Sequence, residues 1–281
     1  MGLQKFTRLF KKGRTVIIGM VHLKSLPGTP GNRLKVEDIT EIACAEAEGY
    51  KKLGVDGIIV ENMHDIPYLH SRDVSHEITA SMATTCYQIR KECPDFPIGI
   101  QVLSGANQQA LAIALATGLD FIRAEGYVFA HIADEGMMNA CAGELLRYRK
   151  NIGAEHIQVL TDIKKKHSSH ALTCDVNITD TAKAAEFFLS DGVVITGGAT
   201  GEPASVDELK VVQDSVNIPV LIGSGVTEDN LHEYSNANGI IVGSSFKMDG
   251  KWGHEVDFNR VQRFMNKARL LESKKLPDSS C

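Results

Sequence analysis

Short runs rich in Val and Ile alternate with longer segments of helical spacing along nearly the whole chain. The runs predict strands at Val16–Val21, Gly57–Val60, Ile98–Val102, Leu119–Arg123, Ile157–Leu160, Val193–Thr196, Pro219–Ile222 and Gly239–Val242. The longer segments predict helices at Asp38–Leu53, Val74–Glu92, Ala106–Thr117, Met137–Asn151, Thr179–Ser190, Val206–Ser215, Glu228–Tyr234 and Asp257–Leu271. Because the strand runs are continuously apolar, both faces of each strand are expected to be buried, as in a parallel sheet. Eight strand–helix units in 281 residues predict an α/β fold with a single (β/α)8 TIM barrel.

The competing architecture is an open, doubly wound sheet. Such sheets usually have fewer units, and their first strand–helix loop often carries a GxGxxG motif, which is absent here. No shift in composition marks a second domain. We therefore expect the barrel to span residues 15–272, with a basic N-terminal extension at 1–14 and a frayed C-terminal tail at 273–281.

The composition excludes several classes of protein. No apolar run approaches the roughly 20 residues that a membrane-spanning helix needs, so no membrane span is expected. A formal net charge of −5 makes sequence-independent nucleic-acid binding a poor candidate function. The 6 cysteines are scattered, form no CxxC pair and follow no secretory signal, which predicts reduced thiols in a cytoplasmic protein and no zinc site.

The N-terminal segment has a charge of its own. The first 36 residues carry a formal charge of +8 and the remainder −13. Leu3, Phe6 and Phe10 fall on one face of a helix that is otherwise basic, as in a mitochondrial address. A location in the mitochondrial matrix is therefore the alternative to the cytoplasm. We favour a short basic helix that lies over the end of the fold, because the first core strand begins near Thr15 and little would be left to cleave.

The loops after the seventh and eighth strands predict a phosphate site. In a TIM barrel the active site lies at the C-terminal ends of the strands, and phosphate groups frequently bind at these two loops. Glycines let backbone N–H groups approach an anion closely, and a following helix N-terminus supplies positive potential. The predicted phosphate-binding residues are Gly223, Ser224, Gly225, Gly243, Ser244 and Ser245.

Ionisable side chains follow several other strands. Asp162 or Glu61 is the predicted general base, with His22, Arg123 and Lys166 assisting through hydrogen bonds or charge. Such groups at one barrel mouth suit proton transfer next to a carbonyl or sugar ring. The predicted catalytic residues are Asp162, Glu61, His22, Arg123 and Lys166, and the predicted substrate loop contains Asn62, Thr196, Gly197 and Gly198.

The remaining polar residues near these strand ends are given a structural interpretation. Lys164 and Lys165 are expected to lie in a solvated basic loop. His22, Glu61, Asp162 and His167 have side chains able to bind a metal, but no ligand motif supports such a site. No metal or cofactor is therefore predicted, although a divalent metal is left open.

With these motifs in this order, the sequence resembles the BtpA family, which is named for a photosystem I biogenesis protein. The segments that carry the resemblance are Ile18–Leu23, Leu26–Pro30, Glu61–Asn62 with Asp65 and Pro67, Phe121–Arg123, Ala133–Gly136, Asp162 with Lys166 and His167, Val194–Gly201, Val220–Thr227 and Ile241–Ser245. The resemblance covers nearly the whole chain and implies a TIM barrel grouped with ribulose-phosphate-binding barrels. Two positions depart from the expected pattern, Lys164 where many relatives have a histidine and Glu125 where they have an amide.

The resemblance does not supply a reaction, because the family is linked to photosystem I assembly while relatives in sugar-utilisation settings suggest metabolic enzymes. The leading hypothesis is an enzyme, an isomerase, lyase or hydrolase, that acts on a small phosphorylated metabolite such as a sugar phosphate or a nucleotide-like compound. The alternatives are a non-catalytic assembly or stability factor and a metabolite sensor without chemistry. The expected partner is the small metabolite, with no nucleic acid and no membrane span, and a homo-oligomer is left open.

Overall fold

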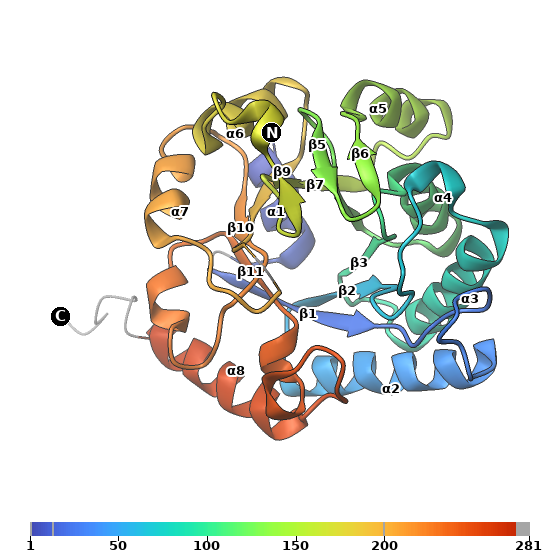
Figure 1. Cartoon of the computed structure of the whole chain (residues 1–281). Coiled ribbons are helices and arrows are strands. Elements are labelled where there is room, and N and C mark those ends of the chain that lie inside the picture. Colours follow the sequence, from blue (N-terminus) through green and yellow to red (C-terminus); the bar gives the residue numbers. More distant parts are fainter. Residues whose placement is uncertain (1, 13, 199, 274–281) are drawn as a thin grey trace.

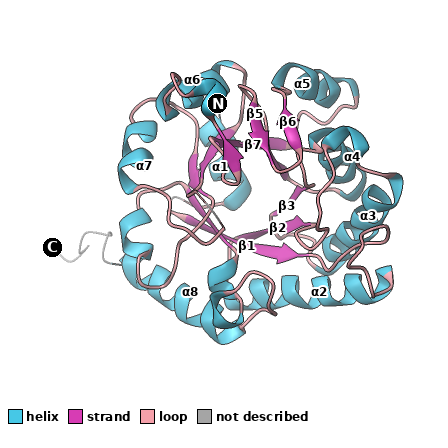
Figure 2. Ribbon diagram, viewed as in Figure 1, coloured by secondary structure: helices cyan, strands magenta, loops and turns pink. Residues whose placement is uncertain are grey.

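The computed structural model describes residues 2–12, 14–198 and 200–273, and its centre is a closed barrel of parallel strands (Figures 1 and 2). Around the barrel the strands follow the order β1-β11-β10-β9-β7-β4-β3-β2, and β2 pairs with β1 to close it. Their bounds are β1 Val16–His22, β2 Gly57–Glu61, β3 Ile98–Gln101, β4 Phe121–Ala124, β7 Gln158–Ile163, β9 Gly192–Ile195, β10 Val220–Ile222 and β11 Gly239–Val242. The predicted single TIM barrel is confirmed.

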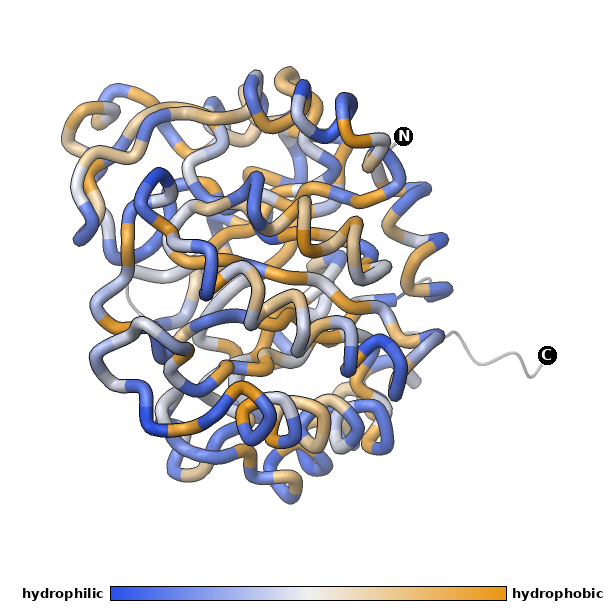
Figure 3. Tube along the Cα trace, turned by 90° about the vertical axis from the view of Figure 1, so that its right-hand side faces the viewer, coloured by the Kyte–Doolittle hydropathy of each residue, from blue (hydrophilic) through white to orange (hydrophobic). Residues whose placement is uncertain are grey.

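Helices surround the barrel on its outer face (Figure 2). They are α2 Val36–Leu53, α3 His76–Glu92, α4 Asn107–Thr117, α5 Ala142–Asn151, α6 Ile178–Phe187, α7 Val206–Gln213 and α8 Phe258–Ser273. Gly54 and Gly118 end α2 and α4 in the left-handed conformation, with φ of 83° and 71°, which lets the chain turn directly into the next strand. Hydrophobic segments run through the interior and hydrophilic turns lie along the outer edge (Figure 3).

Two of the predicted helices differ from the structure. The helix predicted at Met137–Asn151 starts later than expected. Met137 and Met138 belong to a strand, because Gly136, with a φ of 107°, closes a tight hairpin there. The helix begins only at Ala142. The helix predicted at Glu228–Tyr234 is a single 3-10 turn, Leu231–Tyr234.

A small antiparallel sheet extends the C-terminal side of the barrel. It consists of β5 His131–Ala133, β6 Gly136–Met138 and β8 Ser168–Ser169, in the order β6-β5-β8. The first two strands lie in the connection from β4 to α5, and β8 lies in the connection from β7 to α6. The sequence analysis missed this sheet, because its strands are too short to show a period of their own.

The N-terminal helix α1, Gly2–Phe10, closes the other end of the barrel. Phe6 and Phe10 stack at 4.7 Å between ring centroids, and Phe10 lies 6.0 Å from the ring of Phe121 inside the barrel. These rings join an apolar cluster with residues from the interior of the strands, namely Val16, Ile18, Met20, Ile59, Leu160, Val194, Leu221 and Ile241. The helix is therefore the floor of the barrel. The boundaries expected at residues 14 and 272 remain predictions, and the tail from residue 274 lies outside the described residues.

The packing of α1 predicts a strong contrast between Phe6, which is buried, and Leu3, which is exposed although the sequence places it on the same helical face. Phe6 is 3% exposed, so Phe6→Ala should lower the free energy of unfolding by about 3–5 kcal/mol through lost burial and a cavity in the floor. Leu3 on the same helix is 46% exposed, and Leu3→Ala is the matched control, with an expected change within about 0.5 kcal/mol. Urea unfolding measures both. Equal effects of the two substitutions would contradict this assignment of the floor.

Candidate active site

The C-terminal ends of the strands open into a cavity of about 450 Å³. Its walls come from the ends of β1, β2, β3, β4, β7, β10 and β11 and from the long loops that follow them. All five predicted catalytic residues and all six predicted phosphate-binding residues line it: His22, Glu61, Arg123, Asp162, Lys166, Gly223, Ser224, Gly225, Gly243, Ser244 and Ser245. The fold thus brings these residues into one space.

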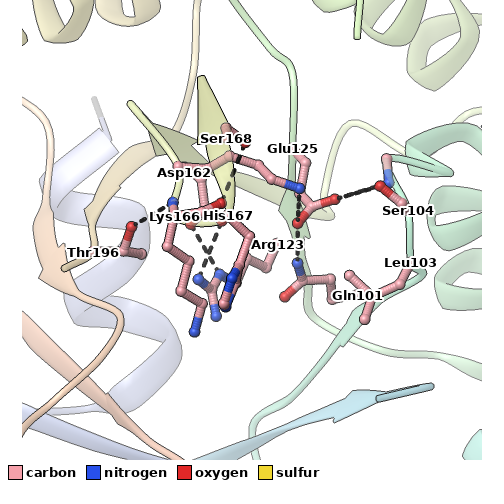
Figure 4. A network of polar contacts seen from close by, with 12 residues as sticks. Gln101, Leu103, Ser104, Arg123, Glu125, Asp162, Lys166, His167, Ser168 and Thr196 are labelled. Carbon is pink, nitrogen blue, oxygen red and sulfur yellow. Dashed lines mark hydrogen bonds and ion pairs between the residues drawn. The ribbon is translucent and has the colours of Figure 1, made fainter. Parts of the chain in front are cut away.

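A bidentate ion pair joins Arg123 at the end of β4 to Asp162 on the neighbouring strand β7 (Figure 4). Arg123 Nε donates to Asp162 Oδ1 at 3.0 Å, and its Nη2 donates to Oδ2 at 3.1 Å. Both side chains are buried. Because both carboxylate oxygens accept from the guanidinium, Asp162 is less available as a proton acceptor than Glu61.

Glu61 and His22 are register partners on the adjacent strands β2 and β1, which places their side chains together. His22 Nε2 lies 3.5 Å from Glu61 Oε2, and His22 Nδ1 lies 3.5 Å from the carbonyl oxygen of Trp252. Burial raises the pKa of Glu61 to about 7, although Arg123 and Lys166 oppose the shift. Burial, with Lys247 nearby, holds the pKa of His22 well below its usual 6.5. At neutral pH the pair therefore contains a neutral imidazole and a carboxyl group that exchanges its proton readily.

Three consecutive lysines follow β7, and each side chain takes a different direction. Lys164 Nζ donates to the carbonyl oxygen of Thr173 at 3.2 Å. Lys165 Nζ forms an ion pair with Glu125 at 3.1 Å. Lys166 lines the cavity. The prediction that this loop is solvated is wrong for Lys165. Its side chain is only 9% exposed, because the ammonium group turns inward to pair with Glu125.

Glu125, one of the two departures from the family pattern, is fully occupied by hydrogen bonds. Besides Lys165, its oxygens accept from Gln101 Nε2 at 3.2 Å, from Ser104 Oγ at 3.4 Å and from the N–H of Gly105 at 2.9 Å (Figure 4). Burial alone would raise its pKa, but Lys165, the charge of Arg123 and the N–H of Gly105 lower the pKa of Glu125 below its usual value. Glu125 is thus a charged structural group rather than a proton carrier.

The two glycine–serine loops follow the paired strands β10 and β11 and lie at the cavity with Arg260. Within the described part of the chain, the N–H groups of Gly225, Ser244 and Ser245 donate no backbone hydrogen bond. Gly225 has a φ of 73°, and a Cβ at this position would lie 2.2 Å from the carbonyl oxygen of Glu202. Arg260 Nε donates to the carbonyl oxygen of Ser245 at 2.8 Å, so its guanidinium lies beside the loop. Unused N–H groups next to a guanidinium form a favourable environment for an anion.

The four predicted substrate-loop residues do not line the cavity. Asn62 is completely buried, its Oδ1 accepts from the N–H of Leu103 at 2.7 Å, and its Nδ2 donates to Asp65 at 2.9 Å. The other three lie in the loop after β9. Thr196 Oγ1 accepts from the N–H of Lys166 at 3.1 Å, and the N–H of Gly197 donates to Ser224 Oγ at 2.7 Å. These residues, with Gly198, hold the cavity loops in place.

Residues with metal-binding side chains are dispersed. Among residues 2–12, 14–198 and 200–273 there is no group of three or more His, Cys, Asp or Glu side chains arranged to hold a metal ion. His167 lies at the exposed rim, where its Nε2 is 2.9 Å from Thr200 Oγ1. Over the same residues, no helix is long and apolar enough to cross a membrane.

Arg260 and Trp252 are among the residues of the cavity wall that sequence reasoning missed. Arg260 lies in the first turn of α8. The helix dipole favours acidic residues in a first turn, so an arginine at this position was the one sequence feature that could have indicated a functional role. Trp252 is the 1 tryptophan of the chain, and it lies 5.1 Å from the ring of His64. No pattern in the sequence connects it with the barrel mouth.

Solved structures with the same architecture include enzymes whose names contain a phosphate or phosphoribosyl group. The chain matches a Mycobacterium tuberculosis tryptophan synthase structure with a TM-score of 0.60 at 14% identity, covering 95% of this chain and 97% of that one. It matches N-(5'-phosphoribosyl)anthranilate isomerase from Pyrococcus furiosus with a TM-score of 0.54 at 15% identity, covering 91% and 99% of the two chains. At these identities the likeness shows the fold alone.

Sequence relatives are found in animals, archaea and cyanobacteria. The chain is 47% identical over 270 residues to an uncharacterized mitochondrial protein of Caenorhabditis elegans, covering 95% of this chain and 97% of the relative. It is 35% identical over 263 residues to the photosystem I biogenesis protein BtpA of Synechocystis, covering 92% and 90%. The family model described as "BtpA family" matches residues 13–270. The chain therefore belongs to the BtpA family.

Proposed function

We propose that this protein is an enzyme that binds a small phosphorylated metabolite, a sugar phosphate or nucleotide-like compound, at the C-terminal face of the barrel. The single observation that carries the proposal is the content of the cavity. The unused N–H groups of Gly225, Ser244 and Ser245 lie beside Arg260 in the loops after β10 and β11, and Glu61 with His22 lies at the ends of β2 and β1, which continue the same barrel wall. An anchored phosphate would hold the rest of the metabolite against the proton-transferring pair.

The reaction that this arrangement supports best is proton transfer next to a carbonyl, as in an isomerase or a lyase. A carboxyl group with a pKa of about 7 both donates and accepts a proton at neutral pH, which is the requirement for a general acid–base group. The buried guanidinium of Arg123 would stabilise negative charge that develops on the carbonyl oxygen. Hydrolysis is a weaker candidate, because no described group is placed to activate water in preference to substrate. No cofactor enters the proposal.

A non-catalytic assembly factor is the second candidate, and the name of the Synechocystis relative is the observation that favours it. A factor of this kind would use the surface of the barrel rather than its cavity. Substitutions of Glu61 and Arg260 would then leave its protein partners bound, whereas an enzyme would lose ligand binding or turnover.

The cellular location is proposed on separate grounds. The C. elegans relative named mitochondrial supports the mitochondrial alternative for this chain. Cleavage of residues 2–10 as a targeting segment after import would remove Phe6 and Phe10 from the floor of the barrel. We therefore propose that any import of this chain leaves α1 attached to the folded protein.

The phosphate site predicts a loss of affinity in Arg260→Gln. Removing one charged hydrogen-bond donor from an anion should weaken binding by about 10- to 100-fold. A panel of phosphorylated sugars and nucleotides, titrated against the fluorescence of Trp252, measures the affinity. Arg263→Gln is the matched control, because Arg263 lies on the same helix and pairs with Glu228 at the surface. Equal binding by the two variants, or no binding of any phosphorylated compound to the unchanged protein, would contradict the proposal.

The raised pKa of Glu61 predicts a pH-dependent effect on stability. The folded state keeps a proton up to about pH 7, whereas an unfolded chain releases it near pH 4.3, so this group alone lowers the free energy of unfolding by roughly 3 kcal/mol as pH rises through that window. Glu61→Gln mimics the protonated carboxyl and removes this loss. The variant should therefore gain stability over the unchanged protein between about pH 5 and about pH 8, as measured by urea unfolding.

The control for this pH measurement is Glu41→Gln, which changes an exposed glutamate on α2. Its stability difference from the unchanged protein should be the same at both pH values. A difference for Glu61→Gln that does not vary with pH would show that Glu61 is charged in the folded protein at both values.

A further inference from the structure

The loop after β7 is held in a defined conformation on both sides of Lys166. Lys164 and His167 adopt the left-handed region, with φ of 45° and 53°, which is unusual for residues other than glycine. The N–H of Lys166 donates to Thr196 Oγ1 at 3.1 Å, and the N–H of His167 donates to the carbonyl oxygen of Gly198 at 3.2 Å. The surrounding contacts therefore maintain a strained loop, as is common where a side chain must be aimed.

The side chain of Lys166 ends in the cavity without an ion-pair or hydrogen-bond partner among the described residues. Its two neighbours do have partners, since Lys164 Nζ donates to Thr173 and Lys165 Nζ pairs with Glu125. In Figure 4 the side chain of Lys166 extends beside the guanidinium of Arg123, away from Lys165's partner Glu125. A largely buried amine without a partner is costly to maintain as an ammonium ion.

The surroundings of Lys166 increase the share of its neutral amine. Burial lowers the pKa of Lys166 below the usual 10.5, and the positive charge of Arg123 lowers it further, while Glu61, Asp162 and Glu125 oppose the shift. Arg123 and Asp162 form one ion pair and their charges act on Lys166 in opposite directions, so burial is the main cause of its lowered pKa. A lysine that is desolvated or close to another cation is the usual form of an amine nucleophile.

We propose that Lys166 is a covalent nucleophile whose Nζ forms an imine with the carbonyl carbon of a phosphorylated aldehyde or ketone held in this cavity. The inference rests on the proposed phosphate site and narrows the substrate class to compounds that carry both a phosphate and a carbonyl group. It also gives Glu61 a specific role, as the proton carrier for the formation of the imine.

The chemical step balances with the groups present. The neutral Nζ attacks the carbonyl carbon, a C–N bond forms, and the π electrons of the C=O bond move to oxygen, which takes the proton of Glu61. Glu61 then accepts a proton from the nitrogen and donates it to the departing hydroxyl group, so that the C–O bond breaks and water leaves. The products are a cationic imine on Lys166, one water molecule and the Glu61 carboxylate. The imine withdraws electrons from the adjacent carbon, where an isomerase or lyase must act.

Pyridoxal 5′-phosphate is a suitable probe, because it carries an aldehyde and a phosphate. The protein is treated with the probe, reduced with borohydride, digested and mapped by mass spectrometry. Since Lys166 Nζ enters the cavity without a partner whereas Lys164 Nζ donates to the carbonyl oxygen of Thr173, Lys166 should be labelled about tenfold faster than Lys164. Lys166→Arg should remove this fast label and Lys164→Arg should leave it, with urea unfolding confirming that both variants fold. Inorganic phosphate should slow the labelling, and pyridoxal, which lacks the phosphate, should react more slowly.

The outcomes separate the two proposals. Labelling of Lys166 no faster than of Lys164 would overturn the nucleophile, and a fluorescence change of Trp252 on addition of phosphorylated compounds would then still support the phosphate site. Fast labelling of Lys166 by pyridoxal and pyridoxal 5′-phosphate alike, without protection by phosphate, would support the nucleophile and overturn the phosphate site.

Discussion

The ion pair between Arg123 and Asp162 determines the electrostatics of the barrel mouth. Two buried charges joined by two hydrogen bonds satisfy each other, and a second closed pair, Lys165 with Glu125, does the same nearby. A buried charge without a partner is unfavourable, so the remaining ionisable groups respond to burial by changing their protonation. Glu61 is therefore driven toward its neutral form, as are His22 and Lys166. All three groups line the cavity.

The interior of the barrel is divided into an apolar half and a polar half. On the N-terminal side, α1 and the inward-facing residues of the strands form the floor, with Phe6 and Phe10 against Phe121. Apolar packing stabilises the fold without specific chemistry. On the C-terminal side, the same strands end in charged residues, and their loops form the cavity. The floor and the larger apolar layer between the strands and the surrounding helices stabilise the barrel, which allows the strained and charged mouth to persist.

The comparisons agree with this division. Likeness to solved barrels at 14% and 15% identity extends over nearly the whole chain, since packing constrains the pattern of strands more than the identity of residues. Membership of the BtpA family does not identify the reaction that this protein would catalyse, because one fold can host many activities. The chemistry has to be read from the particular groups in the cavity, and here those groups are Glu61 with His22, the amine of Lys166, and the unused N–H groups beside Arg260.

The sequence by itself determined the barrel, because eight continuous apolar strands alternating with helices, without a GxGxxG loop, favour a closed parallel barrel over an open sheet. It also indicated the glycine–serine loops and the ionisable strand ends. Only the tertiary structure decided which charges pair. Lys164, Lys165 and Lys166 are identical in the sequence, yet one reaches a carbonyl, one pairs with Glu125 and one enters the cavity. Arg260 lies on α8, which follows the last strand in the chain, and it donates a hydrogen bond to one of the glycine–serine loops. Such contacts arise when the barrel closes and brings distant segments together, so no local pattern contains them.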